Sequence, residues 1–200
     1  MLAFGRLFEL VGGRWPVEEE GSAQRLQVAI RAAVAAVGFA AIYGLAAGST
    51  DPMLALGNLW KVPAVVVLSA LTALPAGLLA HRLFGPEAGT SRLVVALAAG
   101  NFAATLVLAA LSPLIALYYN SSAFWGAPIA LGSVAAALAV GLFSGGRLLH
   151  RSGGGWGMRV PLAVIAVVQL LALLQFTHLA SPILPEQTVF DRGADGVWDR

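Results

Sequence analysis

Five long apolar stretches constrain this sequence more than any other feature. Each has the length that an α-helix needs to cross about 30 Å of hydrocarbon. A chain in lipid must satisfy its backbone hydrogen bonds internally, which favours helices. The stretches run roughly over Leu26–Gly48, Val62–Phe84, Leu93–Tyr119, Trp125–Gly145 and Met158–Ala180. The sequence therefore predicts an all-α polytopic membrane protein, a bundle of five transmembrane helices.

Composition agrees with this class and excludes several kinds of function. Charged residues make up 11% of the 200 residues, whereas soluble domains carry about 25%. The chain has no cysteine, which excludes disulfides, thiolate chemistry and cysteine-ligated metals. The net charge is +2, but the basic residues flank apolar spans, which indicates membrane topology and anionic lipid. A nucleic-acid partner is not expected.

The chain divides into a cytoplasmic N-terminal segment over residues 1–25, a transmembrane domain over 26–180 and an extracytoplasmic polar tail over 181–200. Met1–Val11 places Met1, Phe4, Leu7, Phe8 and Val11 on one helical face but is too short to span. This pattern is typical of an interfacial amphipathic helix, and equally of a helix packed against the bundle.

Two further segments are open to alternative interpretations. A second helix is expected from Pro16, and the acidic run Glu18–Glu20 is either its cap and solvated face or a patch for a partner. In the tail, Phe190 and Trp198 either dock on the bundle or belong to a disordered segment.

Asp51–Trp60 predicts a short separate helix at the outer interface. Asp51 is a helix-capping residue and Pro52 suits the first helical position. Trp60 is expected at headgroup depth. The second span then begins after Lys61.

The basic residues predict the orientation. Three segments share one side: the N-terminal segment and the loops after spans two and four. Together they hold nine of the 12 lysines and arginines: Arg6, Arg14, Arg25, Arg31, Arg82, Arg92, Arg147, Arg151 and Arg159. The other side holds Lys61, Arg192 and Arg200. The positive-inside rule therefore predicts a multi-pass protein of the cell membrane, with a cytoplasmic N-terminus and the tail outside.

Candidate site residues are the few polar groups in or beside the spans. Asn101, Gln169, Gln175 and His178 are candidates either for a polar path or for interhelical contacts. Basic side chains near the cytoplasmic helix ends are candidates for contacts with lipid headgroups: Arg31, Arg82, Arg147 and Arg151. His81 and His150 are expected to act as headgroup anchors beside their neighbouring arginines.

Small residues and prolines inside the spans predict packing. Gly44 with Gly48, and Gly141 with Gly145, form pairs that allow two helices to approach closely. Pro75 and Pro113 should free backbone carbonyls, which side chains such as Thr72 or Asn101 are expected to satisfy.

No enzyme is expected. Ser144 lies in a glycine pair that loosely resembles the serine motif of rhomboid proteases, but its spacing differs by one residue. No nucleophile has a visible base partner. No acidic residue lies inside a span, and no cofactor or metal motif is present.

Several motifs resemble a family of uncharacterised bacterial inner-membrane proteins with five spans. The motifs are Gly38–Gly44, Ala55–Pro63, Leu74-Pro75, Leu111–Pro113 and the pair Ser181-Pro182 with Leu184-Pro185. The family is similar to Yip-domain membrane proteins, which have five spans and a cytoplasmic N-terminus and are linked to vesicle traffic. The DLYGP-like motif of that domain is missing here, and the resemblance implies no functional residue.

Two hypotheses for function follow. The first is a non-enzymatic scaffold or accessory subunit, whose partners are the lipid bilayer and either another membrane protein or further copies of the chain. The alternative is a small channel, flippase or lipid-handling transporter. Six residues would then have to converge on one interior path: Pro75, Pro113, Asn101, Gln169, Gln175 and His178.

Overall fold

The computed structural model describes residues 3–12, 21–84, 90–121, 125–151 and 156–184. These residues form helices and no strand. The helices are α1 (Ala3–Val11), α2 (Ser22–Ala47), α3 (Pro52–Phe84), α4 (Ser91–Ser121), α5 (Gly126–Arg151) and α6 (Trp156–Ala180). Within this part of the chain, 5 helices are long and apolar enough to cross a membrane, which confirms the predicted fold class.

Three predictions fall beyond the described residues. They concern the helix from Pro16, the acidic run Glu18–Glu20 and the docking of Phe190 and Trp198. Helix α2 begins at Ser22, and Gly21 before it has an extended backbone with φ −66° and ψ 157°.

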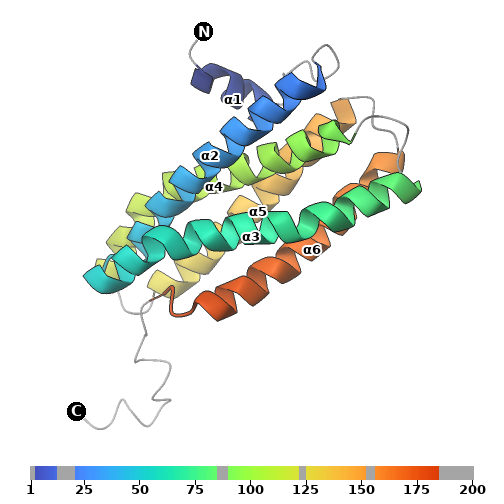
Figure 1. Ribbon diagram of the computed structural model, residues 1–200. Coiled ribbons are helices and arrows are strands. Elements are labelled where there is room, and N and C mark those ends of the chain that lie inside the picture. Colours follow the sequence, from blue (N-terminus) through green and yellow to red (C-terminus); the bar gives the residue numbers. More distant parts are fainter. Residues whose placement is uncertain (1–2, 13–20, 85–89, 122–124, 152–155, 185–200) are drawn as a thin grey trace, which may run out of the picture.

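The five long helices do not pack in chain order. Helix α4 lies between α2 and α5, while α2 also packs on α3, and α3 packs on α6 (Figure 1). Helices α5 and α6 follow one another in the chain but contact each other only slightly. The bundle is therefore an arc, and its two end helices leave a gap between them.

The bundle has two distinct ends. At one end α2, α4 and α6 begin and α3 and α5 finish, and this end carries Arg92, Arg151 and Arg159. We call it the arginine-rich end. The opposite end carries Asp51, Lys61 and the segment 181–184 that follows α6. Helix α1 lies towards the start of α2, away from the end of α6 (Figure 1).

Helix α3 corrects one prediction. Its 33 residues run without interruption from Pro52 to Phe84, so the expected separate helix over Asp51–Trp60 is wrong. The Asp51 cap is present, because its Oδ1 accepts a hydrogen bond from the backbone N–H of Met53 at 2.8 Å. Pro63 lies inside the helix and removes only one backbone donor. Packing against α2 holds the first turns in line with the rest.

Glycines bring the helix backbones into close approach at the predicted pairs. A Cβ atom added to Gly141 would lie 2.7 Å from the carbonyl oxygen of Gly100, and one on Gly145 would lie 3.0 Å from that of Ala96. The α4–α5 contact is thus built from backbone against backbone. On α2, Gly44 meets the backbone of Asn58, and a Cβ on Gly48 would lie 2.5 Å from the nitrogen of Ala55.

Helix α1 packs against the bundle, which is one of its two expected placements. Leu7 and Leu10 are buried in the same core cluster as Phe102. The ring of Phe8 lies edge-on to the ring of Phe102, with centroids 6.3 Å apart. The predicted apolar face is wrong in one respect, because it omitted Leu10, which is fully buried. The reason is that α1 meets both α4 and α5, so its buried surface is wider than one stripe.

The helix-internal prolines behave differently from the prediction. Thr72 donates to the carbonyl of Leu68 at 2.8 Å, and Asn101 donates to that of Leu97 at 3.1 Å. Both carbonyls lie four residues back in the same helix. The carbonyls that Pro75 and Pro113 deprive of a backbone partner are four residues before each proline, and these side chains do not serve them.

Candidate functional site

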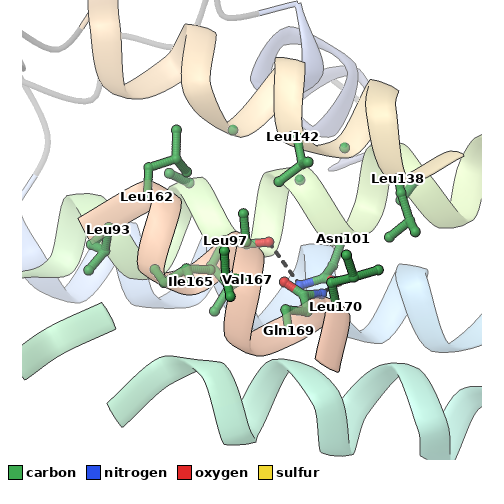
Figure 2. Close-up of a pocket in the computed structure, with 16 residues that line it drawn as sticks. Leu93, Leu97, Asn101, Leu138, Leu142, Leu162, Ile165, Val167, Gln169 and Leu170 are labelled. Carbon is green, nitrogen blue, oxygen red and sulfur yellow. Dashed lines mark hydrogen bonds between the residues drawn. The ribbon is translucent and has the colours of Figure 1, made fainter. Parts of the chain in front are cut away.

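A cavity of about 230 Å³ lies between α4, α5 and α6. We call it the lateral cavity. Figure 2 shows leucines from all three helices around it. Its lining is Leu93, Ala96, Leu97, Gly100, Asn101, Ala104, Leu138, Gly141, Leu142, Gly145, Leu162, Ile165, Ala166, Val167, Gln169 and Leu170. Two of these residues carry polar side chains, so the cavity suits an apolar occupant.

The cavity exists because small residues on α4 and α5 face larger ones on α6. Gly100, Gly141 and Gly145 bring α4 and α5 together and leave no side chains of their own in the space. Helix α6 is held at a distance from α4 by its packing on α3, where Gly77 lies against Ile165.

An amide pair lines the cavity and joins two helices. Gln169 on α6 donates from Nε2 to Oδ1 of Asn101 on α4, at 2.6 Å (Figure 2). Asn101 in turn donates to the carbonyl of Leu97. Both amides are half-buried. In hydrocarbon such a bond gives each amide a partner that lipid cannot offer.

A second cavity of about 220 Å³ lies between α2, α3 and α4, and Asn101 lines it as well. Its remaining lining is apolar, with residues such as Ile30, Ala36, Leu71 and Leu74. Asn101 therefore lies where the two cavities come closest.

The structure does not bring all four polar candidates together. Asn101 and Gln169 are bonded, but Gln175 and His178 are exposed and line neither cavity. His178 follows Gln169 by nine residues, which is about half a turn out of phase at 3.6 residues per turn. It consequently lies on the other side of α6.

The basic candidates lie on the surface. The side chains of Arg31, Arg82, Arg147 and Arg151 are exposed. His150 is exposed as well, but His81 is 5% exposed, so its expected role as a headgroup anchor is wrong. His81 lies on the face of α3 that also carries Ala73, Gly77 and Ala80, which is the buried face.

Sequence reasoning missed a polar group at the opposite end. Asn58 is fully buried and donates from Nδ2 to the carbonyl of Ile183 at 2.6 Å. Lys61 Nζ donates to the carbonyl of Pro182 at 3.2 Å. The segment after α6 is therefore tied to the first turns of α3. Asn58, Val62, Val65 and Ser69 recur at helical spacing along the buried face of α3. This spacing could have predicted from the sequence that Asn58 is buried.

Tyr43 makes a further contact that the sequence did not reveal. Its hydroxyl donates to the carbonyl of Ala130 at 3.3 Å and lies 3.4 Å from Oγ of Ser133. Residues of α2 and α5 are thus joined, although α4 lies between these helices for most of their length.

Within the described ranges, no three histidine, aspartate or glutamate side chains gather as a metal site. Ser144 is buried between Gly141 and Gly145, on the face of α5 that meets α4.

Comparisons with known proteins complete the description. A scan against protein-family models, a search of curated proteins and a search of solved structures each gave no match. The resemblance to five-span inner-membrane proteins stays a prediction. The long apolar helices nevertheless define the broad class. By its helices, this chain is a multi-pass integral membrane protein.

Proposed function

We propose that this protein is a non-enzymatic scaffold or accessory subunit of a complex in the cell inner membrane, with its N-terminus in the cytoplasm. One observation carries the proposal. Polar side chains join α2 to α4, α4 to α6 and α2 to α5, so these helices form a connected framework.

These joining bonds run from one end of the bundle to the other. At the arginine-rich end, Arg25 on α2 donates to Ser91 on α4 at 3.2 Å. In the middle, Gln169 on α6 bonds Asn101 on α4. Near the opposite end, Tyr43 on α2 bonds the backbone of α5. Together with the glycine contacts, they favour a framework that keeps one shape.

Helix α6 offers the surface best suited to a partner. Only 17% of the residues in its apolar stretch are buried inside the bundle, against 33–50% in the other four spans. Its outward side carries Leu171 and Leu174, which are both more than half exposed. In a bilayer, close packing of such a face with another helix is the means by which subunits associate.

Gentle purification from native membranes tests this proposal. We expect the protein to elute as a complex larger than one chain with its detergent micelle. Leu171→Trp with Leu174→Trp should reduce the complex to single chains, because bulky rings prevent a helix from approaching α6. A matched control is Val34→Trp on the exposed side of α2. Recovery of the wild-type chain as a lone monomer contradicts the proposal.

Lipid handling is a second candidate, and the lateral cavity favours it. A protein that moves lipids needs a space that accepts hydrocarbon, and this cavity has one polar pair within an apolar lining. In liposomes, transport of a fluorescent lipid that falls with Gln169→Leu supports this candidate. Transport that neither Gln169→Leu nor His178→Leu changes removes it.

A further inference from the structure

The size of the lateral cavity selects the kind of occupant. A dry apolar cavity of about 150 Å³ binds benzene, so 230 Å³ has room for a longer stretch of hydrocarbon. One turn of a helix about 10 Å wide and 5.4 Å high fills roughly 400 Å³. A partner helix is therefore too large for the cavity, whereas one acyl chain is of suitable width.

The side of the cavity is open towards lipid. Near the arginine-rich end α5 and α6 touch, and a Cβ on Gly146 would lie 3.3 Å from Leu162. Beyond that point the two helices have few contacts. Leu142 on α5 and Val167 and Leu170 on α6 line the cavity and are partly exposed, at 47%, 58% and 45%. An acyl chain can enter sideways between them, without crossing a polar barrier.

Charge at the neighbouring end selects the headgroup. Arg159 precedes the lining residue Ala166 by seven positions, about two helical turns, so both lie on the same face of α6. The side chain of Arg159 is exposed. Arg147 follows the lining residue Leu138 by nine positions and therefore lies on the far side of α5. Glu9 on α1 is the one carboxylate at this end among the residues that the structure describes. The local charge is positive, which attracts anionic lipid.

We propose that the lateral cavity binds one acyl chain of an anionic phospholipid from the leaflet at the arginine-rich end, whose headgroup lies beside Arg159. The lipid fills the gap between α5 and α6 and completes the wall of the bundle. This site does not depend on whether the protein acts as a scaffold.

Native mass spectrometry of the purified full chain tests the site. The probes are phosphatidylglycerol and phosphatidylcholine with identical acyl chains, each added alone. We expect one phosphatidylglycerol to bind about 5-fold more tightly than phosphatidylcholine, from the attraction of one arginine. Equal binding of the two lipids overturns the proposal.

Two pairs of variants locate the acyl chain and the headgroup. Ala166→Phe places a ring in the cavity and should abolish retention of the lipid, whereas Ala136→Phe on the exposed outer side of α5 should not. Arg159→Gln should remove the preference for phosphatidylglycerol, while Arg147→Gln, at the same end but on the far side of α5, should preserve it. Retention of phosphatidylglycerol by Ala166→Phe at the wild-type level overturns the proposal.

A second measurement on the wild-type chain covers the case in which a variant fails to fold. Phosphatidylglycerol with a photoreactive group in its acyl chain is reconstituted with the protein in phosphatidylcholine vesicles and irradiated. Cross-links concentrated at Leu142, Val167 and Leu170 support the site. Cross-links spread evenly over the exposed apolar residues of all five long helices contradict it.

Discussion

At the scale of single residues, the amide pair between α4 and α6 is the most informative contact. Asn101 and Gln169 lie 68 positions apart in the chain and meet at 2.6 Å. Because lipid tails offer no hydrogen-bond partners, each amide provides the partner that the other would otherwise lack.

We expect Gln169→Leu to weaken the fold by about 0.6 kcal/mol, the average for hydrogen bonds between membrane helices, and by at most about 1.7 kcal/mol. Asn101→Leu should behave similarly, and the double variant should be less destabilised than the sum of the two. Unfolding in mixed micelles measures all three free energies. Gln175→Leu on the exposed side of α6 is the control. Strict additivity of the two single changes would show that the pair contributes no coupling.

A pair of glycines on α5 provides a second residue-scale prediction. Gly141→Ala should destabilise the protein by about 1–3 kcal/mol, because its methyl group would lie 2.7 Å from the carbonyl oxygen of Gly100. Gly132→Ala is the matched control, since nothing lies within 4 Å of its added carbon. It should be neutral or slightly stabilising, as alanine is the better helix former. Thermal unfolding of both variants compares them, and equal melting temperatures would contradict the close packing.

At the scale of elements, the length of α3 sets it apart. A straight helix between Met53 and Leu83 covers 30 steps, which is about 45 Å. Spin labels at these two exposed positions should therefore give a distance near that value. A helix that turned into the membrane plane before Lys61 would bring the labels markedly closer, and such a result would restore the separate interfacial helix.

Hydropathy alone was sufficient to predict the spans, because a helix that crosses lipid must be predominantly apolar along its whole length. The neighbours of each span were not predictable in this way. All faces of these helices are apolar, so the period of the pattern does not reveal which face meets a partner. Gly44, Gly141 and Gly145 indicated contact faces, but not that α2 and α4 would lie side by side.

The candidate site was predictable only in part. Asn101 and Gln169 were selected because polar groups in spans need partners, yet their pairing depends on the rotation of two distant helices. Gln175 and His178 were selected by the same rule, but they lie near the end of α6, where their side chains are exposed and line neither cavity. Helix α3 continues through Pro63 because tertiary contacts of Gly44 and Gly48 outweigh one lost backbone bond.

At the scale of the whole molecule, the two ends differ in charge. Among the described residues, Lys61 is the one lysine or arginine at the opposite end, and the described arginines belong to the arginine-rich half. The positive-inside rule then gives an orientation that labelling can test. The sequence has no native cysteine, so single cysteines can be introduced without interference.

We expect Thr50→Cys to react with a membrane-impermeant maleimide on intact cells, because Thr50 is exposed at the end predicted to lie outside. His150→Cys, exposed at the arginine-rich end, should react only after the membrane is opened. Gel shifts of the labelled chains report both reactions. Labelling of both positions in intact cells would overturn the predicted topology.

The bond between Asn58 and Ile183 has a consequence for biogenesis. The two residues lie 125 positions apart, so α2 and α3 are synthesised well before the partner of Asn58 leaves the ribosome. Until α6 is inserted, this amide remains without the acceptor that it finds in the finished bundle. A chain truncated within α6 therefore lacks this closing contact, and the first turns of α3 lose their tie to the segment after α6.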